Sequence, residues 1–312
     1  MGKIVGNGIR LAKRVAKYTI SLAAEAVHLT KWFLSKNRNN RECLNRTERK
    51  EKIIVSLTSF PGRINSVSKT IETILNQKDC KPDKVELWLA ESQFEKKEEE
   101  LPQNLLKLKE YGLDIRWCDD IRSYKKLLPA LVSHPTDIIV TADDDVYYSR
   151  KWLEKLYKSY KMNSTAIHCH RATKIIQKNG KLDVVVGGIE YYPEPACLNK
   201  LVGVGGVLYP PNSLDEEVFN TQAISKYAST NDDIWFWFMA ILNNYKINVV
   251  EKNEPSPITV LGALNSSKLS DVNDRGQNLF WVQLNQMMEQ YVFVKNEIMR
   301  ELAERDSANN RF

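Results

Sequence analysis

Three consecutive aspartates, Asp143, Asp144 and Asp145, follow directly after the apolar run DIIVTA. Neighbouring carboxylates repel one another unless a cation lies among them. In an extended chain alternate side chains share a face, so Asp143 and Asp145 would point one way and Asp144 the other. Two carboxylates on one face suit Mg²⁺ or Mn²⁺, whose other ligands can be diphosphate oxygens and water. We therefore expect Asp143 and Asp145 to bind a divalent metal; a solvated acidic turn is the alternative.

A second acidic pair, Asp232 and Asp233, begins the apolar stretch DDIWFWFMAILN. Capping and the helix dipole both favour carboxylates at a helix N-terminus, which is one explanation of the pair. The other explanation is a general base that accepts the proton of an attacking hydroxyl. Because the pair follows a glycine-rich segment and precedes an apolar helix, its position favours catalysis.

His168 and His170 share one face of an expected strand, an arrangement that can bind a metal. No further ligand accompanies them in the sequence, so we expect a satisfied polar face beside a cleft instead. The other two histidines, His28 and His134, come earlier in the chain, and no later histidine can serve as a metal ligand.

The elements that would position these residues alternate along the chain from residue 53. Short β-rich apolar runs alternate with stretches of helical periodicity, which predicts crossover connections and a parallel sheet covered on both faces. Ligands of such sheets bind at the carboxyl ends of the strands, where the triple aspartate lies. Strands are expected at 52–58, 84–90, 113–118, 137–142 and 166–170, and helices near 67–75 and at 101–111, 124–132 and 152–160.

The second half of the chain is less regular. Val204–Pro211 contains a glycine pair and ends in two prolines. Strands are expected at 184–189, 246–250 and 258–261, an apolar helix at 232–243 and a long C-terminal helix at 279–303.

The basic charge of the chain is concentrated at its N-terminus. Residues 1–52 hold 13 Lys/Arg and 4 Asp/Glu, a balance of +9, whereas residues 53–312 hold 32 and 35, a balance of −3. A nucleic-acid-binding protein more often spreads basic charge over its folded body, so we expect no nucleic-acid partner. The pattern indicates a slightly acidic catalytic body with a basic N-terminal attachment.

This attachment has the periodicity of an amphipathic helix. Its longest uncharged stretch, from Tyr18 to Ala24, is too short to span a bilayer. We expect residues 3–35 to lie on an anionic membrane surface; packing on the catalytic body or on a partner subunit is the alternative. The apolar stripe repeats at spacings of three, four and seven: Ile4, Leu11, Val15, Tyr18, Leu22, Ala26, Leu29 and Phe33.

The five cysteines form no CxxC pair, and their number is odd. Both features favour reduced thiols. Together with the helix, they predict a cytoplasmic protein that is peripheral on the inner face of the cell membrane.

Five sequence blocks, in order, resemble GT-A glycosyltransferases, particularly bacterial enzymes that build lipopolysaccharide or capsular polysaccharide. The blocks are SLTSFPGRI, ILNQ, SYKKLLPAL, GVGGVLYPP and DDIWFWFMA, and the resemblance covers about residues 53–250. It implies a GT-A-like doubly wound, mostly parallel α/β sheet flanked by helices. The expected organisation is an N-terminal helix and linker at 1–52, a catalytic domain at 53–275 and a C-terminal helical extension at 276–312.

The resemblance also implies roles for individual residues. Asp143 and Asp145 form the DXD motif that binds the metal, Gly205 and Gly206 allow close approach of donor sugar and acceptor, and Asp232 and Asp233 are catalytic. The positions with an implied role in nucleotide binding are Thr58, Ser59, Arg63, Glu91, Asp120, Ser123, Lys125, Asp143 and Asp144.

Two departures from the family pattern leave alternatives open. The acidic pair is Asp-Asp where Glu-Asp is commoner, so the base expected at Asp233 could instead be Asp232. The late histidine that some of these enzymes use as a metal ligand is missing; Asp271 or Asp274 could replace it, or lie in a solvated loop.

The expected reaction is metal-dependent transfer of a sugar from a nucleoside diphosphate, by resemblance UDP, to a hydroxyl of a glycan or lipid-linked glycan, with inversion. Two alternatives remain: a sugar nucleotidyltransferase, and a non-catalytic glycan-binding protein of the same fold. SFPGR is a poor match for the phosphate loop of a nucleotidyltransferase.

Overall fold

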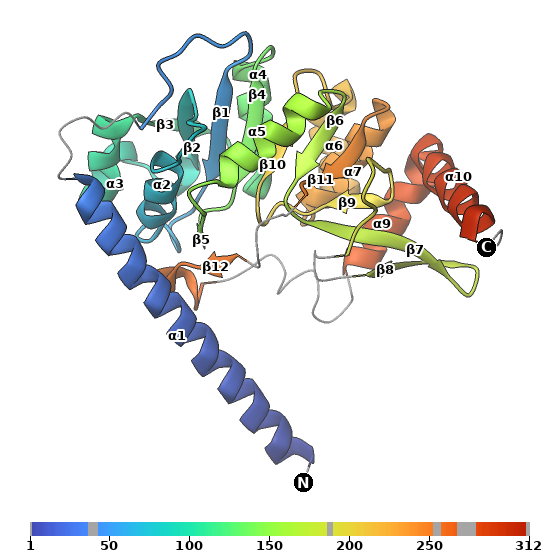
Figure 1. The fold of residues 1–312 in the computed structure, drawn as a ribbon, viewed down its shortest axis with the longest axis horizontal. Helices are drawn as coiled ribbons and strands as arrows, with labels where there is room; N and C mark the ends of the chain where they lie inside the picture. Colours follow the sequence, from blue (N-terminus) through green and yellow to red (C-terminus); the bar gives the residue numbers. More distant parts are fainter. Residues whose placement is uncertain (1, 37–42, 186–189, 252–256, 267–278, 310–312) are drawn as a thin grey trace.

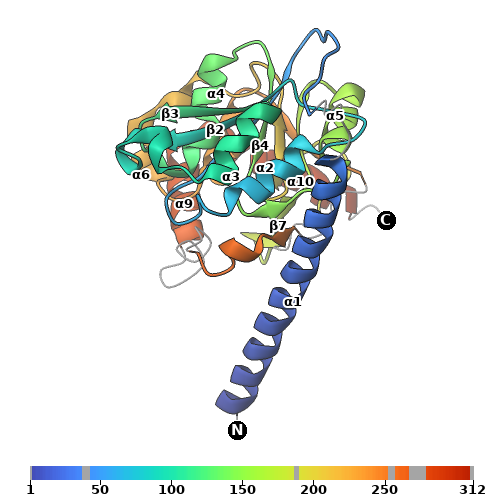
Figure 2. The ribbon, with the colours of Figure 1, turned by 90° about the vertical axis from the view of Figure 1, so that its left-hand side faces the viewer.

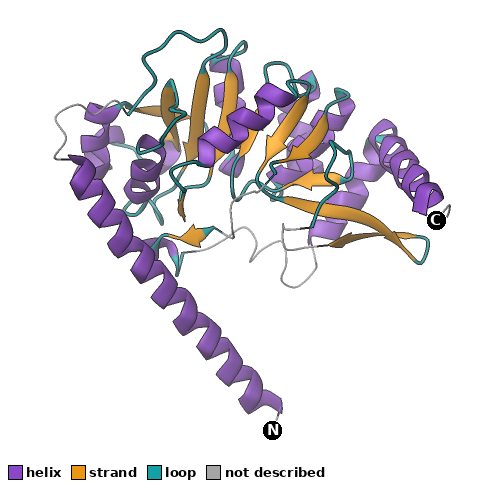
Figure 3. Ribbon diagram, in the orientation of Figure 1, coloured by secondary structure: helices purple, strands orange, loops and turns teal. Residues whose placement is uncertain are grey.

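The computed structural model describes the whole chain except residues 1, 37–42, 186–189, 252–256, 267–278 and 310–312. Its described residues form a central mostly parallel sheet with helices on both faces, so the predicted α/β architecture is confirmed (Figures 1 and 3). The strands follow the order β11 (Lys246–Val249), β6 (Ala166–Cys169), β10 (Val207–Tyr209), β4 (Ile138–Ala142), β1 (Ile53–Thr58), β2 (Lys84–Ala90) and β3 (Leu113–Cys118).

Two hydrophobic cores lie on opposite faces of this sheet. Ile53, Val55 and Leu57 of β1 point into one core, whereas Ile54 between them points into the other. The first core is covered by α2 (Val67–Leu75), α3 (Gln103–Leu106) and α5 (Trp152–Met162). The second is covered by α4 (Leu128–Ser133), α6 (Thr221–Tyr227), α7 (Asp232–Leu242), α9 (Leu279–Gln290) and α10 (Val292–Asn309).

β10 is antiparallel to both of its neighbours, β4 and β6. It is short, because Pro210 and Pro211 cannot donate to a strand ladder. Its direction brings the segment before Val207 to the edge of the sheet where β4 ends. The glycine-rich segment therefore lies beside the triple aspartate.

Two smaller sheets were not expected from the sequence. β7 (Ala172–Lys178), β8 (Lys181–Val185) and β9 (Asn199–Leu201) form an antiparallel sheet, and β12 (Ile258–Thr259) pairs with β5 (Val146–Tyr147). The strand predicted at 184–189 is seen at its first two residues, and the rest lies outside the described residues.

The predicted N-terminal helix is present as α1 (Gly2–Lys36). Only its C-terminal part contacts the body, and the rest extends away from it (Figures 1 and 2). Within the described part of the chain, we find no helix with the length and apolar character needed to cross a membrane.

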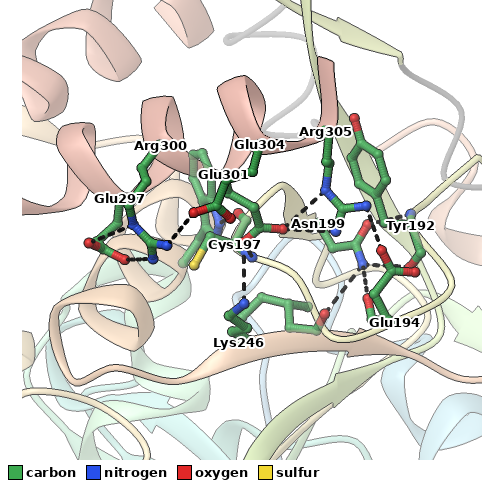
Figure 4. A network of polar contacts seen from close by, with 12 residues as sticks. Tyr192, Glu194, Cys197, Asn199, Lys246, Glu297, Arg300, Glu301, Glu304 and Arg305 are labelled. Atoms are coloured by element: carbon green, nitrogen blue, oxygen red, sulfur yellow. Dashed lines mark hydrogen bonds and ion pairs between the residues drawn. The ribbon is translucent and has the colours of Figure 1, made fainter. Parts of the chain in front are cut away.

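The predicted C-terminal helix is divided into α9 and α10, which meet at Tyr291. From α10, Glu301 points toward the body, where its Oε2 accepts a hydrogen bond from the Cys197 N–H at 3.0 Å. The same carboxylate pairs with Lys246 of β11 at 3.6 Å and with Arg305 at 2.9 Å (Figure 4). These contacts attach the C-terminal helices to the catalytic body.

Candidate active site

A cavity of about 890 Å³ lies at the carboxyl ends of β1 and β4, the place where α/β sheets bind ligands. Its far wall comes from the β7–β9 sheet and from the start of α9. Most of the residues placed at the site from the sequence line it: Thr58, Ser59, Arg63, Asp120, Ser123, Lys125, Asp143, Asp144, Asp145, Asp232 and Asp233.

The three aspartates form a turn instead of extending β4, so the predicted alternation of their side chains does not hold. Arg63 Nη1 lies 2.6 Å from Asp144 Oδ1 and 3.5 Å from Asp145 Oδ2. Asp143 lies toward a different cation, with its Oδ1 3.3 Å from Lys126 Nζ. The Val260 N–H donates to the Asp145 carbonyl at 2.7 Å, which holds the turn against β12.

Asp144 is buried, and both of its carboxylate oxygens have partners. Oδ1 accepts from Arg63, and Oδ2 accepts from Ser59 Oγ at 2.6 Å. Burial raises the pKa of Asp144 above its usual value, and Arg63 and Ser59 oppose this. Asp144 therefore positions Arg63 and Ser59, the two residues that follow β1 into the cavity.

Asp143 and Asp145 are the carboxylates of the turn that fit a divalent ion. Mg²⁺ is commonly held by one or two carboxylates, with substrate phosphates and water completing its shell. In the part of the chain that the structure describes, no three His, Cys, Asp or Glu side chains are grouped to hold a metal. Two carboxylates would hold such an ion only together with a phosphate ligand or water. Asp271 and Asp274 lie outside the described residues.

The acidic pair at the start of α7 does not cap the helix. Asn231 does so, because its Oδ1 accepts from the Ile234 N–H at 3.2 Å. Asp233 Oδ1 accepts from the Gly203 N–H at 3.0 Å, and Asp232 Oδ2 lies 3.0 Å from Lys126 Nζ. Capping by the pair is therefore excluded, whereas the helix dipole still favours both carboxylates in the first turn of α7.

The pKa of Asp233 is raised to about 6. Burial is the largest cause, and the charge of Asp232 adds to it, while Lys200, Lys126 and the Gly203 N–H oppose it. A carboxylate with a pKa near the working pH is suited to accept a proton.

Lys126 joins the two acidic groups, and sequence reasoning chose its neighbour Lys125 instead. Burial would lower the pKa of Lys126, but Asp232, Asp143 and Asp233 raise it, so the side chain stays a cation. Lys125 pairs with Asp120. The helix predicted over 124–132 starts as a 3₁₀ turn, η4 (Arg122–Lys126), before α4, and consecutive residues of such a turn point about 120° apart.

Gly203, rather than Gly205 or Gly206, is the glycine that lines the cavity. A Cβ on Gly203 would lie 2.8 Å from Asp233 Oδ1 and 3.0 Å from Lys126 Nζ, so the absence of a side chain makes room for both. Gly205 and Gly206 have positive φ angles of 112° and 96° and pack against Arg171 and Trp152.

The structure does not bring Glu91 to the cavity. Its side chain is 56% exposed and pairs with Lys97 at 3.0 Å. Gln93 lines the cavity instead and donates to Asp120 Oδ2 at 2.8 Å. Directly after β2 the chain turns into a 3₁₀ helix, Glu91–Gln93. Because of this turn, Gln93 lines the cavity and Glu91 does not.

The two strand histidines have hydrogen-bond partners, as expected, but they lie in the core and not beside the cavity. His168 Nδ1 lies 2.8 Å from Ser159 Oγ, and its Nε2 lies 2.8 Å from the Asn163 carbonyl. Burial lowers the pKa of His168 to about 4. His170 Nε2 donates to the Trp152 carbonyl at 3.1 Å. Neither side chain lines the cavity.

Comparison with known proteins gives little beyond this geometry. No family model matches the chain, and no curated protein matches it. Among solved structures it is similar to one titled "Crystal structure of S. aureus TarS 1-349", with 15% identity and a TM-score of 0.45 over 76% of this chain and 72% of that chain.

Proposed function

We propose that this protein is a metal-dependent glycosyltransferase of the GT-A type. It would move a sugar from a nucleoside-diphosphate donor to a hydroxyl of a surface-glycan precursor. The observation that carries the proposal is that two acidic groups from different elements face one cavity of about 890 Å³. Transfer needs both, since one would hold a metal with the diphosphate and the other would take the proton of the hydroxyl.

The charge of the cavity supports a requirement for a cation. Among the described residues, five Lys/Arg and six Asp side chains line it, a formal balance of −1. A diphosphate adds negative charge, so its binding needs a further cation close by. We propose that Asp143 and Asp145 hold Mn²⁺ or Mg²⁺, which when bound stabilises the negative charge on the departing diphosphate.

We propose Asp233, and not Asp232, as the general base. Asp232 is buried and paired with Lys126, which fixes its side chain in place. Asp233 is the more exposed of the two, and its pKa is raised to about 6. In the proposed step the acceptor oxygen bonds to the anomeric carbon, its proton passes to Asp233, and the bond to the diphosphate oxygen breaks on the opposite side, with inversion.

The acceptor would bind at the far wall of the cavity. Phe280 and Trp281, from the first turn of α9, line this wall with their rings edge to face at 5.3 Å. Lys200 lies beside them, with its Nζ 5.8 Å from the Phe280 ring. Aromatic faces with a few polar groups are typical of small-ligand sites, and this pair offers such a surface to a sugar ring.

Calorimetric titration of UDP, GDP and CDP, with Mn²⁺ or with EDTA, tests the donor site. We expect metal-dependent binding of one nucleotide, by resemblance UDP, and its loss in Asp145→Asn. Asp233→Asn should bind the nucleotide like wild type but lose about 10²- to 10⁴-fold in kcat.

Other outcomes would replace the proposal. Release of pyrophosphate from a nucleoside triphosphate and a sugar phosphate would identify a nucleotidyltransferase. Glycan binding that needs no metal, in a protein that binds none of the three nucleotides, would identify a binding protein.

A further inference from the structure

One half of the surface of α1 is apolar and exposed. Val15, Ile20, Leu22, Val27 and Leu29 are between 51% and 59% exposed. At about 100° per residue they spread over roughly half of the helix circumference. No Lys, Arg, Asp or Glu of residues 12–30 falls within that half. Single exposed apolar residues are ordinary, but a continuous row along a helix marks an interaction surface.

The two threonines in this half satisfy their own hydroxyl groups. Thr19 Oγ1 donates to the Val15 carbonyl at 3.0 Å, and Thr30 Oγ1 donates to the Ala26 carbonyl at 2.9 Å. Such bonds within the helix remove most of the cost of taking a hydroxyl out of water. The alanines of this half, Ala12, Ala16, Ala23 and Ala26, add no polar group. The whole half-surface can thus enter an apolar medium.

The body contacts α1 through its polar side. His28 Nε2 lies 2.6 Å from Glu72 Oε2, and Glu25 pairs with Lys69, both on α2. Asn265 Nδ2 donates to Tyr18 OH at 2.7 Å. A helix that packs on its own domain normally buries its apolar side. The alternative of packing on the body thus holds for the polar side of α1, whereas Val15, Leu22 and Leu29 of the apolar stripe are exposed.

We propose that α1 lies in the surface of an anionic lipid bilayer, with its apolar half among the acyl chains and Lys13 and Lys17 at the headgroups. α1 contains seven Lys/Arg and one Glu. Such a helix is attracted to anionic lipid, with an effect on the order of fivefold in affinity for each basic residue. Pairing of this face with a second copy would bring two strongly basic helices together, which disfavours self-association.

The position of α1 places the cavity beside the same surface. α1 packs on β12 and on η6 (Leu261–Ala263), and Thr259 of β12 lines the cavity. Next to Asn265, which bonds to α1, Ser266 Oγ accepts from Arg63 Nε at 2.8 Å. The bilayer would therefore lie close to the rim of the cavity, where an acceptor carried on a lipid can reach it.

Co-sedimentation of the full chain with vesicles tests this inference. Vesicles of phosphatidylcholine alone are compared with vesicles that also contain phosphatidylglycerol. We expect wild type to bind the anionic vesicles more tightly, and less so as salt is raised. The double variant L22E/V27E should lose at least about tenfold in affinity, because two side chains no longer enter the acyl region.

The matched control is V132E/M162E on α4 and α5, which places the same two charges at positions that are 68% and 78% exposed; it should bind like wild type. Circular dichroism confirms that each variant is folded. Unchanged binding of L22E/V27E, or failure of wild type to bind anionic vesicles, would overturn the inference. A wild-type dimer in sedimentation velocity that L22E/V27E dissociates would also overturn it, because the apolar half of α1 would then bind a second copy. Neither measurement depends on catalysis, so failure here is distinct from failure of the proposed transferase.

Discussion

The ammonium group of Lys126 lies between carboxylates of two different elements, Asp143 after β4 and Asp232 on α7. It also lowers the pKa of Asp233, against the effects of burial and of Asp232. The groups that face Asp233 are, besides Lys126 and Asp232, the cation Lys200 and the neutral side chains of Tyr124, Tyr209 and Cys169. One buried cation thus affects both acidic groups.

Lys126→Gln should raise the pKa of Asp233 above its present value of about 6. A general base acts in its deprotonated form, so the wild-type kcat should fall as the pH drops through about 6. In the variant this acid limb should move to higher pH, with a several-fold loss at about pH 6 that shrinks in alkaline buffer. A kcat–pH profile measures it, and Lys126→Arg, which keeps the charge, should leave the limb in place. An unmoved limb in Lys126→Gln would contradict this role.

Sequence reasoning found the carboxylates of the site, but it missed two of their partners, Lys126 and Gly203. The acidic groups were found because charged residues that directly follow an apolar run must lie where the buried element ends. Which of the neighbouring lysines, Lys125 or Lys126, contacts the acidic pair depends on the path of a 3₁₀ turn. Whether Gly203 or Gly205 lines the cavity depends on the path of a glycine loop. Long-range packing sets these paths, and it leaves no periodic signal in the sequence.

At the scale of elements, the loop before β10 is shaped by α5. Trp152, the first residue of α5, is fully buried and donates its Nε1–H to the Gly205 carbonyl at 2.6 Å. Gly206 lies so close to the indole that a Cβ would come within 2.6 Å of it. Since Gly203 belongs to the same loop, this contact helps to place the Gly203 N–H that bonds to Asp233.

Gly206→Ala should destabilise the protein by about 3 kcal/mol, from a positive φ and from overlap with a buried indole. Gly180→Ala is the matched control, because Gly180 has a φ of 72° but nothing within 4 Å of an added Cβ. It should cost only about 1 kcal/mol. Guanidinium unfolding measures both, and equal losses would show that the contact with Trp152 does not matter.

The central strands β1 and β4 could be predicted because each is an almost continuous apolar run that is buried on both faces. The smaller sheets were missed for physical reasons. β5 and β9 are only two or three residues long, too short to show a period. A strand was predicted at the position of β12, but not its pairing with β5. The β7–β8 hairpin does carry a signal in Asn179-Gly180, both with positive φ, as a type I′ turn requires. The break between α9 and α10 at Tyr291 could not be predicted, because no Pro or Gly lies next to it in the sequence.

At the scale of the whole molecule, α10 packs on the body through apolar side chains and through one buried carboxylate. Glu301 is 5% exposed and contacts Cys197, Lys246 and Arg305, which lie before β9, on β11 and on α10 itself (Figure 4). Glu297 is less buried than Glu301, and it pairs with the exposed Arg300 on the same helix.

Glu301→Ala should lower the free energy of unfolding by about 1–3 kcal/mol, because it leaves the buried Cys197 N–H without an acceptor. Glu297→Ala, on the same helix, removes only an exposed ion pair and should change stability little. Denaturant unfolding of both variants measures the difference. Equal midpoints for the two would show that Glu301 is not the attachment of α10.

The reversed direction of β10 also constrains how the chain can fold as it is synthesised. In the finished sheet β6 and β4 do not touch, because β10 lies between them and is made later than both. β1 to β4 can pair as soon as they emerge from the ribosome. β6 has no place in the sheet until Val207–Tyr209 is available, and the open edge of β4 stays exposed until then. A chain that stalls just before residue 207 would therefore hold the triple aspartate and the glycine loop, but not the strand that fixes the loop beside the aspartates.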